Sequence, residues 1–163
     1  MLLISPASNK GTEKMRAVIQ RVDRAAVAVG GREISSIGRG LVAFLGVEKG
    51  DEHRDADYLL EKIANMRVFE DGEGKMNLSL LETGGELMII SQFTLFGDCR
   101  KGRRPSFYRA EEPLRARELY EYFVAAATDR IAIVGAGEFQ AMMKIDLVND
   151  GPVTLLLDSR NNL

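Results

Sequence analysis

The sequence predicts one mixed α/β (α+β) domain with a largely antiparallel sheet and two main helices. The chain has 163 residues, which suits a single domain, and its 45% apolar and 28% charged residues are typical of a globular protein. Short β-branched segments recur between glycine turns, and two longer segments carry apolar residues at helical spacing. No repeat, low-complexity tract or internal linker divides the chain.

The first half of the sheet is predicted from short segments separated by turns. Gly30-Gly31 supplies the positive φ values that a tight hairpin needs, and Gly38-Arg39-Gly40 predicts a second turn. Asp71-Gly72-Glu73-Gly74 predicts a further, exposed turn. The strands expected in this half are Val18–Val22, Ala25–Val29, Arg32–Ile37 and the apolar central strand Leu41–Val47.

Two segments have the spacing of amphipathic helices. Asp51 is placed to cap a helix over Glu52–Met66, and Pro113 suits the first turn of a helix that extends to about Ala127. The apolar face of the first helix is expected to comprise Leu59, Leu60, Ile63 and Met66. That of the second is expected to comprise Leu119, Tyr122, Phe123 and Ala126.

The remaining strands lie in the second half of the chain. Glu86–Ser91 is typical of a buried strand and runs into Gln92-Phe93-Thr94-Leu95. Ala141–Val148 alternates like a strand, Asn149-Asp150-Gly151-Pro152 is expected to break it, and Val153–Leu157 resumes it.

The N-terminal segment differs in composition from the rest. Met1–Lys14 is small and polar after a short apolar start, too short for the core of a signal peptide. The alternating pattern begins at Met15. We therefore expect residues 1–14 to form a disordered extension, and the domain to span residues 15–163.

The single cysteine, Cys99, and the single histidine, His53, exclude several chemistries. One cysteine forms no internal disulfide and favours a reducing, cytoplasmic location. The pair cannot supply the four ligands of a typical zinc site, and we expect no metal and no other cofactor. His53 lies among charged residues, where a solvated role is favoured over a Ser-His-Asp triad. No glycine-rich phosphate loop follows a strand, and no apolar run is long enough to span a membrane.

Two polar segments stand out. Ser91-Gln92-Phe93-Thr94-Leu95 places hydrogen-bonding side chains at the end of an apolar strand, where they are expected to be nearly buried and to need partners. Asn149-Asp150-Gly151-Pro152-Val153-Thr154 contains a Gly-Pro step, which cannot donate a ladder hydrogen bond from Pro152. Taken singly, the first is equally explained as a strand terminus and the second as a hairpin turn.

Together, the two segments resemble the signature motifs of the D-aminoacyl-tRNA deacylase family. The similarity extends from Met15 to about Ser159, and Gln140 departs from it where a smaller residue is expected. The resemblance implies a partial β-barrel and a homodimer with its active site at the subunit interface. The segments that add to it are Met15–Val22, Gly74–Leu78 and Arg104–Phe107.

The resemblance also implies the reaction and its residues. The family hydrolyses the ester of D-aminoacyl-tRNA, and glycine mischarged on tRNA-Ala is expected to be a substrate as well. A cis Gly151-Pro152 step of one subunit would enter the partner's pocket and exclude L-amino acids by a steric clash. The catalytic residues expected are Ser91, Gln92, Phe93 and Thr94. The substrate-binding residues expected are Arg21, Asn149, Gly151 and Pro152.

The sequence does not decide which group attacks the aminoacyl ester. Thr94 is one candidate nucleophile, but no histidine or lysine is evident to activate it. Water assisted by the terminal ribose hydroxyl is the favoured alternative, with Thr94 orienting the reactants. Backbone N–H groups around Phe93 and Thr94 would then stabilise the oxyanion.

A basic loop between Gly97 and Glu112 predicts contact with tRNA. Arginines pair with phosphates, and a neighbouring aromatic can stack on an unpaired base. The alternative is a solvated loop balanced by Glu111 and Glu112. The residues expected to bind tRNA are Arg100, Lys101, Arg103 and Arg104.

Two rival functions use the same residues differently. A non-catalytic module bound to replication origins would need only the basic loop and a dimer. An editing enzyme for L-alanine on threonine tRNA would be expected to carry an altered first motif and a trans Gly-Pro step. Hydrolysis of D-aminoacyl-tRNA separates the first rival, and enantiomer preference separates the second.

Overall fold

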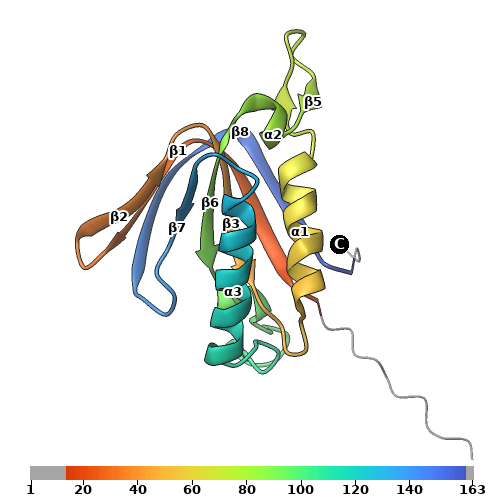
Figure 1. Ribbon diagram of the computed structural model, residues 1–163. Coiled ribbons are helices and arrows are strands. Elements are labelled where there is room, and N and C mark those ends of the chain that lie inside the picture. Colours follow the sequence, from red (N-terminus) through yellow and green to blue (C-terminus); the bar gives the residue numbers. More distant parts are fainter. Residues whose placement is uncertain (1–13, 161–163) are drawn as a thin grey trace, which may run out of the picture.

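One long strand organises the sheet. In the computed structural model, which describes residues 14–160, β1 (Arg16–Val29) has partners along both edges. On one edge its first half pairs antiparallel with β3 (Gly40–Gly46), and its second half pairs with β2 (Arg32–Ile37). Its other edge pairs antiparallel with β8 (Met143–Asp158). These ladders confirm the largely antiparallel sheet (Figure 1).

Two parallel strands extend the sheet beyond β3. These are β6 (Glu86–Ser91), which pairs with β3, and β7 (Val134–Ala136), which pairs with β6. Parallel neighbours need a crossover connection. The helices α1 (His53–Asn65) and α3 (Pro113–Thr128) lie in the two crossovers and cover the same face of the sheet (Figure 1). They are the two main helices that the sequence predicts.

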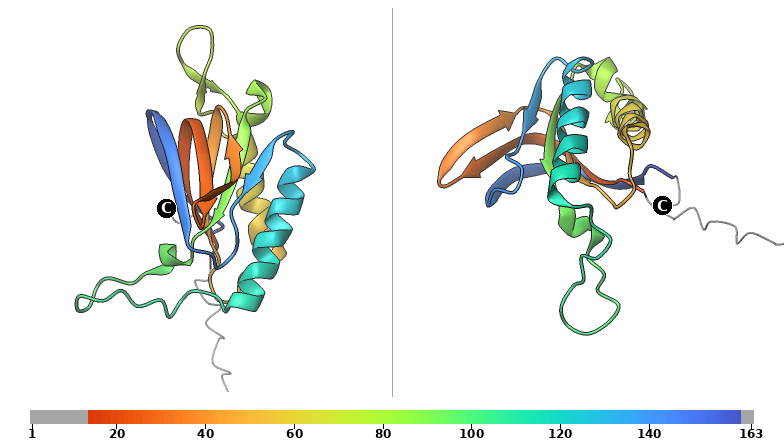
Figure 2. Two further views of the ribbon diagram at one scale, coloured as in Figure 1. Left: turned by 90° about the vertical axis from the view of Figure 1, so that its left-hand side faces the viewer. Right: turned by 60° about the horizontal axis from the view of Figure 1, so that its bottom comes forward.

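The two faces of the sheet have different surroundings. On the face under the helices, Ile19, Leu41 and Leu87 pack in one core cluster with Leu59 and Phe123. The opposite face carries a smaller cluster, and neither α1 nor α3 covers it; the sheet curves there into a partial barrel (Figure 2). The residues of that cluster are Val22, Ala25, Val27, Ile37, Val42, Met88 and Ile90.

The predicted cap of α1 is wrong by one residue. Glu52, not Asp51, is the N-cap, because its side chain and that of Asp55 form a reciprocal capping box with the backbone. Asp51 lies just before the helix and is only 2% exposed. Leu59, Leu60 and Ile63 are buried as predicted, whereas Met66 is the C-cap and half-buried.

The predicted face of α3 is correct but incomplete. Leu119 and Phe123 are buried as expected, and Tyr122 and Ala126 are partly buried and pack against the core. Tyr120 is buried as well, which was not predicted. Because the Tyr120 hydroxyl donates to the Ile89 carbonyl at 2.9 Å, this side chain is satisfied inside the core. Tyr122 instead donates to Asp57 near the surface.

A small hairpin and a short helix follow α1. The hairpin consists of β4 (Phe69–Glu70) and β5 (Met76–Leu78), and the predicted turn at its tip projects from the body (Figure 2). Helix α2 (Leu80–Thr83) was not predicted, although Ser79 and Glu82 form a capping box whose spacing is visible in the sequence.

Strand β8 is continuous where a break was predicted. It remains paired with β1, but the register jumps from Gln20–Thr154 to Val22–Asn149. Between these two pairs β8 contains more residues than β1, so the Asp150–Val153 segment bulges out of the ladder. Pro152 is accommodated because a bulge requires no ladder bond from its nitrogen.

Gln140 adopts φ of 62°, a left-handed conformation that favours glycine, which explains why a smaller residue was expected there.

Residues 1–13, nearly all of the expected extension, lie outside the described range. Lys14 is described: its backbone N–H donates to Glu48 at 2.8 Å, and its ammonium lies 3.6 Å from Asp158. Within residues 14–160, no helix is long and apolar enough to cross a bilayer.

Candidate active site

The first motif forms a tight turn at the end of β6. The N–H of Gln92 donates to the Leu45 carbonyl at 2.8 Å, and the chain then turns through the 3-10 helix η1 (Phe93–Phe96). Gly46 permits this turn, because an added Cβ would lie 2.9 Å from the Phe96 ring and 3.0 Å from the Gln92 carbonyl oxygen.

The side chains of this motif are more accessible than predicted. Phe93 is 57% exposed, Thr94 is exposed, and Ser91 and Gln92 are half-buried. The expectation of near-burial is wrong because the chain leaves the sheet after Ser91 and turns over the surface. The Gln92 amide donates to the Thr94 hydroxyl. The first N–H groups of a helical turn have no partner within it, so those of Phe93 and Thr94 are available to a ligand.

The second motif is held by Arg21. The Gly151-Pro152 bond is cis, as the resemblance implies, Gly151 has φ of 115°, and both residues are exposed. Arg21 is only 4% exposed. Its Nε donates to the Asp150 carbonyl at 3.3 Å and lies 3.1 Å from the Asp150 carboxylate. Its Nη1 donates to the Val68 carbonyl at 2.7 Å, which ties the segment to the base of the β4–β5 hairpin.

Asn149 supports the same segment from within β8. With its amide oriented to suit its neighbours, its nitrogen donates to the Arg21 carbonyl at 2.8 Å and to the Val153 carbonyl at 3.3 Å. Asn149 therefore spans the start and end of the bulge. Its amide nitrogen thus bonds to backbone, its oxygen faces the Gln20 side chain, and the side chain is partly accessible.

The two motifs lie apart within one chain. Across the sheet, Ser91 on β6 pairs with Leu45 on β3, which pairs with Ala17 on β1. Gly151 lies on β8, on the other side of β1, beside Arg21, which is four residues further along β1 than Ala17. Three strand spacings of about 4.8 Å and four residues of about 3.3 Å separate them, or roughly 20 Å. The two motifs are therefore on separate parts of the sheet within one subunit.

The basic loop projects from the end of the molecule opposite the β4–β5 hairpin (Figure 2). Arg100 is already paired with Asp98, donating to its two carboxylate oxygens at 2.9 and 2.6 Å. These bonds hold the pKa of Asp98 far below its usual value. Lys101, Arg103 and Arg104 are exposed and form no ion pair within residues 14–160.

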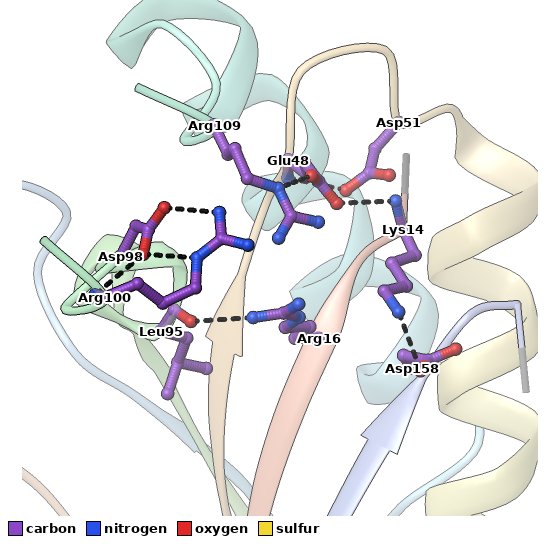
Figure 3. A network of polar contacts seen from close by, with 9 residues as sticks. All are labelled: Lys14, Arg16, Glu48, Asp51, Leu95, Asp98, Arg100, Arg109 and Asp158. Carbon is purple, nitrogen blue, oxygen red and sulfur yellow. Dashed lines mark hydrogen bonds and ion pairs between the residues drawn. The ribbon is translucent and has the colours of Figure 1, made fainter. Parts of the chain in front are cut away.

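Aromatic and ionic contacts connect this loop to the first motif. The rings of Phe93 and Phe107 meet edge to face, with centroids 5.0 Å apart. At the base of the loop, Arg109 Nε lies 2.5 Å from the carboxylate of Glu48, which is buried (Figure 3). A shallow pocket of about 260 Å³ opens beside η1, lined by Arg16, Ala17, Val18, Leu95, Leu156 and Leu157.

The family model described as D-Tyr-tRNA(Tyr) deacylase matches residues 18–158, a range that includes both motifs. The chain belongs to this family. Among curated proteins, a D-aminoacyl-tRNA deacylase of Syntrophus aciditrophicus is 61% identical over 90% of this chain and 98% of its own length. One of Kosmotoga olearia is 58% identical over the same shares. The predicted membership of the deacylase family is confirmed.

Solved structures share the deacylase fold. One described as c-Myc DNA Unwinding Element Binding Protein is 39% identical, with a TM-score of 0.83 over 87% of this chain and 97% of that chain. One described as a probable eukaryotic D-amino acid tRNA deacylase has a TM-score of 0.78 over 89% of this chain and 99% of that chain. It is 17% identical, so this likeness concerns the fold alone.

Arg16 is a residue at this site that sequence reasoning missed. Its Nη1 donates to the Leu95 carbonyl at 3.2 Å, and its guanidinium lies 4.9 Å from the centre of the Phe96 ring. No sequence pattern marks it, because an arginine at the start of a strand is ordinarily solvated.

Proposed function

We propose that this chain hydrolyses the ester of D-aminoacyl-tRNA to free D-amino acid and tRNA, and also clears glycine mischarged on tRNA-Ala. The observation that carries the proposal is the family match across both motifs. Hydrolysis of the aminoacyl ester is the reaction of a D-aminoacyl-tRNA deacylase, the name carried by relatives up to 61% identical. Glycine is included because it has no side chain for a chiral filter to reject.

The catalytic groups are assigned to the turn after β6. The N–H groups of Phe93 and Thr94 stabilise the oxyanion, and one such donor contributes about 3–4 kcal/mol. Ser91 and Gln92 position the ester or the water. Thr94 accepts a hydrogen bond from Gln92 and has no histidine or lysine bonded to it within the described residues, which favours an orienting role. Attack is assigned to water assisted by the ribose hydroxyl.

Chiral selection is assigned to Gly151 and Pro152 of a second subunit. The separation of roughly 20 Å between the motifs, estimated from strand geometry, supports a homodimer in which each copy completes the other's site. Backbone carbonyls of the exposed segment would hold the substrate amino group and fill the space that an L side chain requires. Discrimination then rests on a clash with the wrong enantiomer. Arg21 and Asn149 keep the segment in place.

The experiment that tests the proposal compares D-Tyr-tRNA with L-Tyr-tRNA at sub-stoichiometric enzyme. Rapid loss of the D ester alone is expected, because the filter rejects the L side chain. Equal loss of both esters would show that the enzyme does not select between enantiomers. Preferential cleavage of an L-alanyl ester would favour the editing rival. If neither ester is lost faster than in buffer, the proposal fails.

The tRNA is assigned to the basic loop, and removal of its charges should weaken binding without changing chemistry. The variant Lys101→Ala/Arg103→Ala/Arg104→Ala is expected to raise KM about tenfold with kcat retained. The slope of log KM against log salt should fall by about 2, since each phosphate contact to a single strand contributes roughly 0.7.

A matched control removes the same charge elsewhere. Arg32→Ala/Arg54→Ala/Arg117→Ala changes three exposed arginines outside the loop. If it shifts KM and the salt slope as much as the loop variant does, only net charge matters and the loop assignment is wrong. Kinetics measured from 50 to 300 mM KCl provide both readouts.

Binding of nucleic acid without catalysis is a second candidate function. It is favoured by the similarity to the structure described as a DNA-unwinding-element binding protein and by the exposed cations of the loop. Salt-sensitive binding to DNA, with no hydrolysis of D-Tyr-tRNA, would select it.

A further inference from the structure

Arg16 connects the first strand of the sheet to the catalytic turn. Its side chain leaves β1 and reaches η1, where Nη1 donates to the Leu95 carbonyl at 3.2 Å (Figure 3). The same guanidinium lies 4.9 Å from the centre of the Phe96 ring, within the range of a cation–π contact. Two consecutive residues of the turn are therefore held by one side chain.

Few other contacts hold this turn. Within it, the N–H of Leu95 donates to the Gln92 carbonyl at 3.3 Å, and that of Gly97 donates to the Thr94 carbonyl at 3.0 Å. A single 3-10 turn has poor hydrogen-bond geometry and little intrinsic stability. Phe96, 2% exposed, is its one buried anchor. The orientation of the Phe93–Thr94 peptide groups thus depends on contacts from outside the turn.

Arg16 is not an optimal residue for stability. Its Nε is buried and has no hydrogen-bond partner in the described part of the chain. An unpaired buried donor destabilises the folded protein, a cost that an apolar side chain of similar length would not incur. A residue that breaks a local rule in this way, next to a candidate site, is expected to have a functional reason.

Arg109 does not duplicate this role. Its guanidinium lies 5.9 Å from the centre of the same Phe96 ring, but its Nε is paired with the Glu48 carboxylate. Within residues 14–160, Arg16 makes the one side-chain hydrogen bond to the backbone of η1. Arg16 also lines the pocket beside the turn, together with Leu95 and Leu156.

We propose that Arg16 is a positioning residue for ester hydrolysis, which fixes the Phe93–Phe96 turn so that its amides and Thr94 face the reacting ester. This inference rests on the proposed function, because it assumes that the turn carries the catalytic groups. Because the contacts of Arg16 are made to the turn, its effect is expected on kcat. Binding of tRNA, assigned to the basic loop, does not depend on it.

The test compares Arg16→Met and Arg16→Lys with Arg24→Met. Arg24 is a matched control on the same strand: its side chain is 64% exposed and pairs with Asp146. Arg16→Met is expected to lower kcat for D-Tyr-tRNA by about 10–100-fold, the usual cost of a misplaced catalytic group, with KM within about threefold. Arg16→Lys retains a cation and a donor and should recover part of the loss. Thermal unfolding of Arg16→Met should occur at or above the wild-type temperature.

Two kinetic outcomes overturn the proposal. An unchanged kcat in Arg16→Met means that the turn needs no such support. A raised KM with unchanged kcat means that Arg16 binds tRNA instead. A lower kcat in a variant that also unfolds well below the wild-type temperature would overturn it as well, because the loss of activity would then reflect general unfolding.

Hydrogen exchange tests the structural link independently of activity. The amides of Leu95 and Gly97 should exchange at least tenfold faster in Arg16→Met, and at the wild-type rate in Arg24→Met. Unchanged exchange overturns the proposal even if activity falls. If wild-type enzyme cleaves no ester but exchange accelerates as expected, the proposed function fails while the link between Arg16 and the turn stands.

Discussion

An Arg21→Met variant is expected to lose about 1–3 kcal/mol of unfolding free energy, the cost of leaving a buried hydrogen-bond acceptor without its donor. Arg21 is 4% exposed, and its guanidinium contacts the Val68 carbonyl, the Asp150 carbonyl and the Asp150 carboxylate. Methionine fills a similar volume but leaves these acceptors without a donor. Urea unfolding of the two proteins at pH 7 measures the difference.

Deacylation by Arg21→Met should fall more than stability alone explains. Under conditions where the variant remains folded, the Asp150–Gly151 segment has lost its support, and the cross-subunit filter is no longer held in place. We expect kcat/KM for D-Tyr-tRNA to fall by about 100-fold, with a smaller ratio between the D and L esters. The exposed Arg24→Met variant serves as control. A change in unfolding free energy below 1 kcal/mol, or an unchanged D/L ratio, would contradict the supporting role of Arg21.

The longer strands could be predicted because their signals are local, although β1 was expected as two strands and is one. The short strands β4, β5 and β7 were not predicted. Glycine pairs mark the hairpin after β1, and period-two alternation marks the strands of the antiparallel ladder. The buried face of α3 could not be predicted in full, because Tyr120 is buried through a hydrogen bond to β6, which is distant in sequence. The continuity of β8 was missed because Gly151 and Pro152 signal a break, whereas β1 pairs on both sides of the bulge.

The residues of the candidate site could be predicted from the sequence, but the contacts between them could not. The two motifs name the groups, and the resemblance supplies their roles. Neither indicates that the Arg21 guanidinium reaches Val68, or that Arg16 crosses to the turn, because both contacts join segments far apart in sequence. Nor does a linear pattern show that Arg100 is paired with Asp98, which leaves the other loop cations as the accessible ones.

Burial gives the carboxyl group of Asp51 an unusual charge state. Asp51 is 2% exposed; its Oδ2 accepts the Glu48 N–H at 2.7 Å, and its Oδ1 has no partner in the described residues. Desolvation, above all, raises the pKa of Asp51 to about 8; the nearby carboxylates of Asp55 and Glu48 add to the rise, and Arg160 opposes it. The group is therefore mostly neutral at pH 7 in the folded protein and ionised in the unfolded chain.

The sign of the resulting pH dependence follows from linkage. Between the unfolded pKa near 4 and the folded pKa of about 8, the folded protein binds one more proton than the unfolded chain. The contribution of Asp51 to stability is thus fully present below about pH 4 and is lost as the pH rises through 8. Each pH unit within this window lowers the unfolding free energy by at most about 1.4 kcal/mol.

Asp51→Asn should remove this dependence, because an amide keeps the acceptor for the Glu48 N–H and never ionises. We expect its unfolding free energy to exceed that of the wild type by at least about 2 kcal/mol at pH 8.5 and to differ little at pH 4. Urea unfolding across that range measures both curves, with the exposed Asp23→Asn as control. Parallel curves for wild type and Asp51→Asn would show that Asp51 is ionised in the folded protein. A neutral Asp51 does not repel the carboxylate of Glu48. That carboxylate pairs with Arg109 at the base of the basic loop and accepts the Lys14 N–H (Figure 3).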